Sequence, residues 1–463
     1  MAILYRTIAV FTTISLLLST FLTVSVATSF SPTDNYLVDC GSVVDSTVNN
    51  RHFTSDRNLF SSEGSITLKS VDQAPNLPQI YKTARIFTEK AKYEFNIVEK
   101  GIHMVRLHFH RFNFTDAEFH VTVNDYGVLR NFTGDDDESR VREFLIWVDL
   151  GKVVIRFFPS RESKFAFVNG IEVISAPKDL IEDDATSVLT NGTERFSGLV
   201  KQAMEVVYRI NVGGKKVTPF NDTLWRNWIP DDEYFKGSDG SEKVYFLGRI
   251  KYRRGGASRE VGPDNVYNTA RVVRSENGVV PRVNMTWEFP VSDGYKYLIR
   301  LHFCDIASVS IGMLYFNVYV NGNLAYEDLD IADATDYVLA SPYYIDFVVD
   351  DEFSSLGLIS VSIGPSSKSV EHAVDGILNG VEIMKMNNTL GSFDGFVSTE
   401  MILSRCPNRR YVSLFMSMVA FMCILMSVWI VIQRRKAKKG FGWLRLSSDN
   451  VPEDNNPKTA NRV

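Results

Sequence analysis

The chain has 463 residues, with 50 Lys and Arg against 55 Asp and Glu and a formal net charge of −5. This length suggests roughly two to three domains. Hydrophobic residues make up 45% of the chain and aromatic residues 12%, which excludes a wholly disordered protein. The mild acidity argues against a general nucleic-acid binder. Four cysteines exclude a disulfide-dense miniature scaffold.

The first 27 residues have the pattern of a secretory signal peptide. Arg6 is the only charged side chain in this stretch, and an apolar run follows over residues 8–26. Ser25 and Ala27 supply the small residues that precede a cleavage point. We therefore expect residues 1–27 to direct the chain into the secretory pathway; an uncleaved anchor helix is the alternative.

A second apolar run, at residues 411–432, contains no charged side chain. At about 1.5 Å rise per residue it reaches roughly 33 Å, enough for a hydrocarbon core of about 30 Å. Five basic residues follow between Arg434 and Lys439, and such a cluster stays cytoplasmic under the positive-inside rule. The pattern predicts a transmembrane helix at 411–432, a short basic cytoplasmic tail at 433–463, and a single-pass type I plasma-membrane protein with an extracellular N-terminus. A buried core helix is the alternative.

Six Asn-X-Ser/Thr sequons precede the apolar run and none follows it. Each match is weak alone, because the pattern arises often by chance. Together they support a glycosylated exterior. The acceptor residues are Asn113, Asn131, Asn191, Asn221, Asn284 and Asn387.

The part of the chain before the apolar run contains two copies of one repeated unit. Five segments recur in the same order, and the spacing between the copies grows from 172 to 210 residues. This is typical of a duplicated domain whose second copy has gained loop residues. The matched segments are 36–41 with 208–213, 81–85 with 267–271, 105–109 with 299–303, 119–124 with 316–321, and 169–173 with 379–383.

The shared segments alternate with period two, which predicts β-strands. In the first copy Val105, Leu107 and Phe109 share one face, and Arg106 and His108 lie on the other. Short strands separated by Gly, Asn, Asp and Pro favour β-sandwiches over a parallel α/β sheet. We expect an all-β chain with domains at 34–177 and 206–386. Between them lies a linker, 178–205, with a short helical candidate at 198–207, and a juxtamembrane stalk follows at 387–410.

These repeats resemble the tandem malectin-like ectodomain of plant FERONIA-type receptor kinases. The resemblance rests on the Tyr-Leu-Val-Asp-Cys-Gly-Ser opening at Tyr36, on Ala84-Arg85, on both Arg-Leu-His-Phe strands, and on Asn-Gly-Val-Glu-Ile-Met-Lys at 379–385. It covers most of residues 34–390. Residues 442–446, Gly-Trp-Leu-Arg-Leu, are similar to the stretch that precedes the kinase in that family.

The resemblance implies two tandem malectin-like β-sandwich domains that bind an extracellular ligand. Its expected partners are a secreted peptide of the alkalinisation type, held jointly with a lipid-anchored co-receptor, or cell-wall polysaccharide such as pectin. No ligand-binding position can be matched residue by residue, so the ligand-binding residues stay unknown.

The 31 residues at 433–463 contain none of the kinase motifs. We therefore expect no enzyme activity, and a kinase-less receptor-like protein that acts as a co-receptor for a kinase-bearing relative or as a decoy. A structural tether between cell wall and membrane, a truncated product of a receptor kinase, and a cell-surface carbohydrate enzyme are the rival interpretations.

The remaining polar motifs favour structural roles. His108 and His110 lie on one strand face, but no third metal ligand stands at a recognisable spacing. The acidic runs 135–138 and 231–233 are more often solvated faces than paired catalytic carboxylates. We expect no catalytic residue, no metal and no cofactor.

Three cysteines, Cys40, Cys304 and Cys406, precede the membrane span, and Cys423 lies within it. Three is an odd number, so one thiol is unpaired or bridges another chain. Cys406 stands five residues before the span. We therefore hypothesise a covalent dimer through Cys406.

Overall fold

The structure, a computed structural model, describes residues 30–62, 64–69, 77–110, 112, 116–134, 140–161, 164–237, 240–253, 256–274, 284–350, 357–369, 373–405 and 409–440. The expected signal peptide, the Asn113 sequon, Cys406 and residues 441–463 lie outside the described residues. The chain forms two compact units, Met1–Ile402 and Leu403–Val463.

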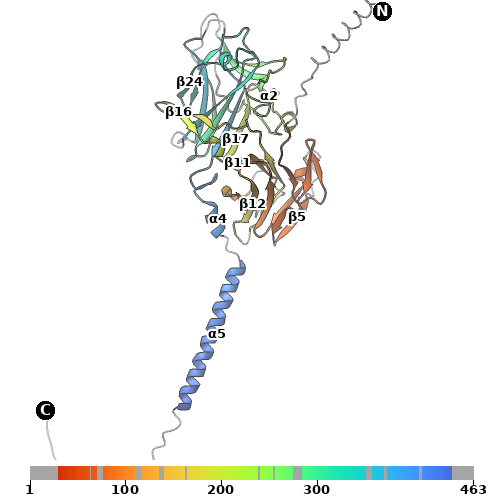
Figure 1. Cartoon of the computed structure of the whole chain (residues 1–463), viewed down its shortest axis with the longest axis vertical. Coiled ribbons are helices and arrows are strands. Elements are labelled where there is room, and N and C mark those ends of the chain that lie inside the picture. Colours follow the sequence, from red (N-terminus) through yellow and green to blue (C-terminus); the bar gives the residue numbers. More distant parts are fainter. Residues whose placement is uncertain are drawn as a thin grey trace, which may run out of the picture. The chain divides into compact units, whose positions relative to one another are not determined.

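The first repeat folds as a β-sandwich, coloured red to brown in Figure 1. Strands β1, β2, β3, β8, β11 and β14 belong to a large sheet, and β4, β7, β9, β10 and β12 form a second layer. The elements are β1 (Asn35–Asp39), β2 (Ser46–Val48), β3 (Arg51–Ser55), β4 (Phe60–Ser62), β5 (Ser65–Lys69), 3-10 helix η1 (Gln79–Tyr81), β6 (Thr83–Phe87), β7 (Ala91–Ile97), β8 (Gly101–Phe109), β9 (Phe119–Val123), β10 (Tyr126–Phe132), β11 (Arg140–Val148), β12 (Gly151–Pro159), β13 (Ala166–Val168) and β14 (Gly170–Ser175).

The second repeat has the same architecture. Strands β17, β22, β25 and β28 continue the large sheet, and β21, β23, β24 and β26 form the facing layer. The elements are β15 (Asp184–Leu189), β16 (Gly192–Ser197), η2 (Leu199–Lys201), β17 (Met204–Asn211), η3 (Pro219–Asn221), β18 (Ile229–Pro230), β19 (Ser241–Tyr245), α2 (Asp264–Tyr267), β20 (Thr269–Arg274), β21 (Met285–Pro290), β22 (Tyr297–Cys304), β23 (Tyr315–Val320), β24 (Asn323–Asp330), α3 (Ile331–Ala334), β25 (Pro342–Val349), β26 (Leu358–Pro365), β27 (Val374–Leu378) and β28 (Gly380–Met386).

The predicted core face of the repeated strands is confirmed. Val105, Leu107 and Phe109 of β8 are buried in the core of the first sandwich, together with side chains from β9 and β12. Ile299 and Leu301 of β22 occupy the equivalent core of the second. Full burial of one such side chain stabilises the fold by about 1.5–3 kcal/mol relative to exposure. Period-two alternation therefore identified the inner face of both sandwiches correctly.

The large sheet runs without a break through both repeats. Its strand order is β16-β15-β25-β22-β28-β17-β11-β8-β14-β1-β3-β2. The two domains meet where β11 pairs antiparallel with β17, from Glu143 opposite Val206 to Leu145 opposite Met204. Because backbone hydrogen bonds cross the boundary, the domains are joined as one sheet rather than as two bodies on a tether.

The segment between the repeats, predicted to be a linker, carries a β-hairpin. Strands β15 and β16 pair antiparallel from Asp184–Ser197 to Leu189–Gly192, and β15 also pairs in parallel with β25 at Thr186 and Ser187. The helical candidate at 198–207 is wrong, since η2 covers only Leu199–Lys201 and β17 begins at Met204. Pairing with a distant strand outweighs the weak local preference for helix there.

The segment that follows the second domain, residues 387–402, returns to the first domain; we call it the strap. Gly391 O accepts a hydrogen bond from Gly127 N, and Phe393 N donates one to Gly127 O, both at 2.9 Å. Phe393 is 1% exposed and belongs to the core of the first sandwich. Gly395 N donates to the hydroxyl of Tyr295 in the second domain. These residues, expected in a stalk, thus contact both domains.

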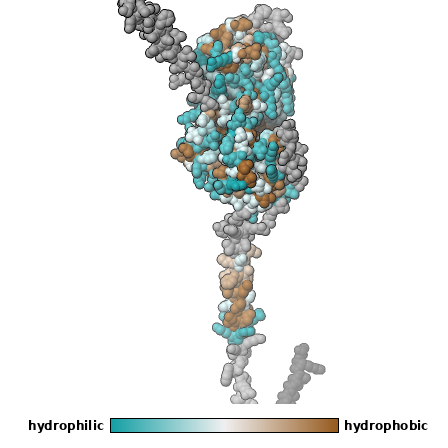
Figure 2. Space-filling view, turned by 90° about the vertical axis from the view of Figure 1, so that its right-hand side faces the viewer, coloured by the Kyte–Doolittle hydropathy of each residue, from teal (hydrophilic) through white to brown (hydrophobic). Residues whose placement is uncertain are grey.

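The second unit contains the long helix α5 (Arg409–Gly440), preceded by α4 (Thr399–Arg405), which begins in the first unit. Residues Phe415–Lys436 of α5 are apolar and long enough to cross a membrane. Their side chains form the brown band on the helix in Figure 2, with teal residues at one end. The apolar helix predicted at 411–432 is therefore present.

Candidate ligand-binding groove

The predicted non-core face of the large sheet is also buried, and it holds a histidine in each domain. Tyr81 hydroxyl lies 3.0 Å from His108 Nδ1, and His108 Nε2 lies 2.9 Å from a Glu172 carboxylate oxygen. In the tautomer that donates from Nε2 to the carboxylate, Nδ1 accepts from the tyrosine, so both ring nitrogens are hydrogen-bonded. The same arrangement recurs as Tyr267, His302 and Glu382, at 3.0 and 3.1 Å.

Buried ion pairs link these histidine groups across the domain boundary. Glu143 of β11 accepts from Arg106 at 2.7 Å and from Arg209 of β17 at 2.9 Å, and Arg209 also pairs with Glu382 at 2.7 Å. Burial opposes ionisation of Glu143, but the two guanidinium groups lower its pKa to about 2. Charges buried this deeply depend on complete pairing. We call this row of ion pairs the ion-pair ladder, and we assign it to joining the domains rather than to ligand binding.

The acidic run at 231–233 is exposed at Asp232 and Glu233, as predicted, but not at Asp231. Asp231 is fully buried and accepts hydrogen bonds from Arg271 Nε, Trp287 Nε1 and the amide of Gly213. Asp232, beside it, pairs with Arg271 and Lys243. The prediction fails for Asp231 because the arginine of the repeated Thr-Ala-Arg motif needs a buried counter-charge. The run at 135–138 lies outside the described residues.

No cluster of three or more His, Cys, Asp or Glu side chains among the described residues is arranged to hold a metal ion. His110 stacks edge-on against Phe112 with ring centroids 5.6 Å apart. Burial lowers the pKa of His110. Its ring is therefore packed within the first domain.

A groove of about 560 Å³ lies where the β15–β16 hairpin meets β25. Its floor includes Tyr343 and Tyr344 at the start of β25, and Arg300 lies 4.3 Å from the ring centre of Tyr344. Arg300 in turn pairs with Asp346 through two hydrogen bonds of 2.8 and 2.7 Å. A buried, double hydrogen-bonded ion pair thus holds the floor of the groove rigid.

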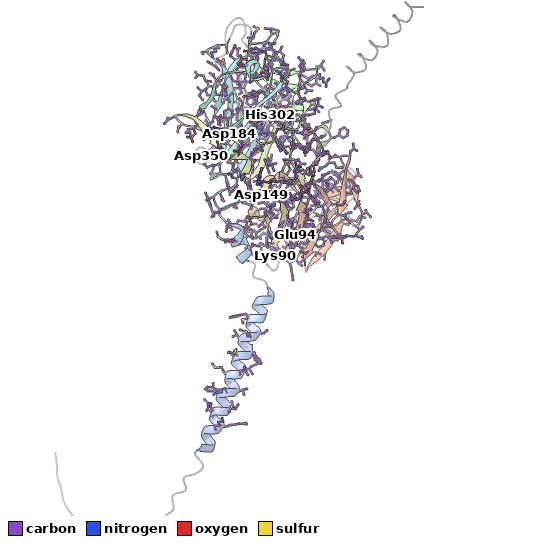
Figure 3. All side chains as sticks on the ribbon, in the orientation of Figure 1. Lys90, Glu94, Asp149, Asp184, His302 and Asp350 are labelled. Atoms are coloured by element: carbon purple, nitrogen blue, oxygen red, sulfur yellow. The ribbon has the colours of Figure 1, made fainter. Side chains whose placement is uncertain are left out.

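The walls of the groove are acidic and polar. Asp184, labelled in Figure 3 at one edge of the second domain, pairs with Arg195 across the hairpin at 2.5 Å. Glu182 and Glu194 also line the groove, and among the described residues neither forms an ion pair with Lys or Arg. The lining carries four carboxylates, of Glu182, Asp184, Glu194 and Asp346, against the single cation Arg195.

Comparison with known proteins assigns the double sandwich to a family. The profile of the malectin-like domain matches residues 38–386. The chain belongs to the malectin-like family. HERK 1 and THESEUS 1, receptor-like protein kinases of Arabidopsis thaliana, are each 36% identical over 395 and 402 residues. The alignments cover 84% and 83% of this chain but only 46% of each kinase.

Solved malectin-like ectodomains have the same fold. FER, in its complex with the peptide RALF23 and with LLG2, is 31% identical with a TM-score of 0.68, over 79% of this chain and 99% of that one. The ANX1 ectodomain of Arabidopsis thaliana is 28% identical with a TM-score of 0.70, over 78% and 98%. The chain spans about half the length of the kinases it matches, and no kinase domain aligns within it. The predicted FERONIA-type, all-β ectodomain is thus confirmed.

Both malectin-like domains bury one free thiol. Cys40 and Cys304 are 0% exposed, each in the core of its own domain, and neither is in a disulfide. Burial raises the pKa of both thiols. The expectation that either joins a disulfide or reaches another chain is therefore not met. Cys423 is exposed on α5.

Three sequons of the described residues are open to solvent, and two are partly enclosed. Asn131, Asn191 and Asn221 are exposed, and Asn284 and Asn387 are half-buried. Asn387 Oδ1 accepts from Gln202, and its Nδ2 donates to the carbonyl of Asn388 at 2.9 Å. The carboxamide of Asn387 is thus already used within the fold.

Proposed function

We propose that this chain binds a secreted peptide of the RALF type, together with a co-receptor of the LLG2 type, through its tandem malectin-like ectodomain. The observation that carries the proposal is the relation to FER, whose complex contains both a peptide and LLG2 and whose chain is covered almost completely. Cell-wall carbohydrate is the second candidate ligand, supported by the tyrosine side chains in the lining of the groove.

The apolar helix supports a place in the plasma membrane for this activity. With α5 across the bilayer and basic residues at its C-terminal end, the positive-inside rule orients the ectodomain outward. Since no kinase aligns within these residues, we propose that the chain contributes binding alone. A kinase-bearing relative would supply phosphorylation, or the chain would retain peptide as a decoy.

An outward ectodomain would carry glycans on its solvent-facing sequons. We propose Asn131, Asn191 and Asn221 as the occupied sites, because their side chains are exposed, and Asn387 as empty, because its amide is bonded within the fold. Mass spectrometry of peptides released after deglycosylation in heavy-oxygen water measures occupancy at each site. Full occupancy of Asn387 in folded protein would contradict the assignment.

The binding proposal is tested on the full chain in lipid nanodiscs. We expect RALF23 and LLG2 together to bind with a Kd of about 1 μM or tighter, measured by biolayer interferometry. A peptide of the same composition in scrambled order is the control for bare charge. Equal binding of both peptides, or none of RALF23, would refute the peptide function, and saturable binding of a pectin fragment alone would favour the wall–membrane tether.

A further inference from the structure

Strand β16 is the free end of the large sheet. It pairs with β15 on one side only and is the terminal strand in the order of the described elements. Five of its six residues are exposed and only Phe196 is half-buried. It contains no proline, so its backbone is open to pairing. At the opposite end of the sheet, β2 has only three residues.

The hairpin register shows which backbone groups of β16 point away from β15. Leu189 and Gly192 flank the two-residue turn and close it with a hydrogen-bonded pair. Hydrogen-bonded and non-bonded pairs alternate along an antiparallel ladder. The N–H and C=O groups of Thr193, Arg195 and Ser197 therefore face outward, and a further strand would find three donors and three acceptors in line.

The groove beside this edge has the charge that selects a partner. Asp184 and Asp346 are matched by Arg195 and Arg300, whereas Glu182 and Glu194 have no cationic partner in the described part of the chain. Alternate side chains of an added strand lie on one face, about 7 Å apart. Basic residues at alternate positions would therefore complement both carboxylates.

We infer that β16 and the adjacent acidic groove bind an extended, basic segment of a secreted peptide, which adds to the large sheet as a further strand. This inference rests on the proposed peptide-binding function and specifies where the peptide sits. Main-chain pairing supplies affinity in such strand addition, and the alternate side chains supply specificity. The occupant is a peptide rather than a polysaccharide, because a sugar chain offers no matching ladder of amide donors.

The sharpest test replaces one outward backbone donor. In Arg195→Pro the edge N–H is lost and the hairpin ladder keeps its hydrogen bonds, and Arg195→Ala is the matched control that loses only the side chain. With the full chain in nanodiscs, LLG2 and RALF23, we expect R195P to bind about tenfold more weakly than R195A. Equal affinity of the two variants, while the wild type binds, would overturn the inference and leave the peptide function standing.

The charge part of the inference has its own variants. The double change Glu182→Gln with Glu194→Gln keeps shape and removes both unmatched carboxylates. We expect about tenfold weaker binding at low salt, with a smaller difference at high salt because exposed charges are screened. The control is Asp350→Gln. Asp350 pairs with Lys296 and lies outside the groove lining. A salt-independent affinity in all variants would contradict charge selection.

Hydrogen exchange gives a readout that does not depend on any variant. The amides of Thr193, Arg195 and Ser197 should exchange rapidly in the free chain and become protected when RALF23 binds. Asn191→Gln removes a glycan at the turn and should leave this protection unchanged. If RALF23 binds but protects a different surface, the location is wrong. If RALF23 does not bind at all, the proposed function fails before the location is tested.

Discussion

The two malectin-like domains share their buried polar groups and differ at the edges of their sheets. Both hold a Tyr–His–Glu group at nearly the same distances. Among the described residues, the second domain alone gains a hairpin from the preceding segment and, with it, the groove at β25. What the duplication retained is therefore scaffold, because unpaired polar groups in a core are costly, and what it added is the surface available to a partner.

The ion-pair ladder between the domains gives the strongest test of the view that the shared polar groups are scaffold. We expect Glu143→Gln to lower the free energy of unfolding by about 4 kcal/mol, because Arg106 and Arg209 remain buried with one fewer counter-charge. Chemical denaturation followed by tryptophan fluorescence measures the change. Glu94→Gln, at an exposed pair with Lys92, is the control and should leave stability unchanged. A small effect of E143Q would mean that the domains do not depend on this ladder.

The strap provides a second test, because it follows the second domain in sequence while Phe393 packs into the core of the first. We expect Phe393→Ala to destabilise the first domain by about 3 kcal/mol through the cavity it leaves in that core. Phe396→Ala removes the same ring three residues later, where it is 70% exposed, and should change stability by less than about 0.5 kcal/mol. Domain-resolved hydrogen exchange distinguishes the two; equal effects would show that the strap is not docked.

Acid should loosen the domain boundary through Glu143. Its folded pKa is lowered to about 2, below the ordinary value of 4.5, so its pairing stabilises the fold fully above about pH 5. That stabilisation, about 3 kcal/mol, is lost as the pH falls from about 5 toward 2, because the unfolded chain binds the proton more readily. We expect a steeper loss of stability with acid in the wild type than in E143Q. Parallel pH profiles would contradict this account.

Local sequence patterns predicted the sandwich. They did not predict which strand faces are buried by segments from distant parts of the chain. Alternation identified the core face of β8 because one face of a strand is sampled by every second residue. Arg106 and His108 lie on the other face, which the alternation alone suggests is exposed to solvent. They are buried because other parts of the chain, including Leu224, pack over that face, and such non-local cover leaves no periodic signal.

The groove was missed for a related reason. Asn191-Gly192 is a hairpin signal, but within a polar segment it was interpreted only as part of a sequon. Whether a hairpin joins a sheet depends on a partner strand far along the chain, here β25, more than 150 residues later. The acidic side chains at 182–184 are evident in the sequence. No sequence spacing connects them with the tyrosines that complete the groove.

The smallest expected effect tests whether the repeated Tyr–His–Glu groups are equivalent. Tyr267→Phe removes the hydroxyl that bonds His302, and Tyr81→Phe does the same for His108. We expect each change to cost about 1–2 kcal/mol, because the ring still fills its site while a buried imidazole nitrogen loses its donor. The two sites are separate, so the double variant should show the sum of the single effects. Thermal unfolding of the single and double variants measures this; a change in RALF23 affinity in either single variant would instead show that a histidine group acts in binding, and the division between shared scaffold and added surface would have to be given up.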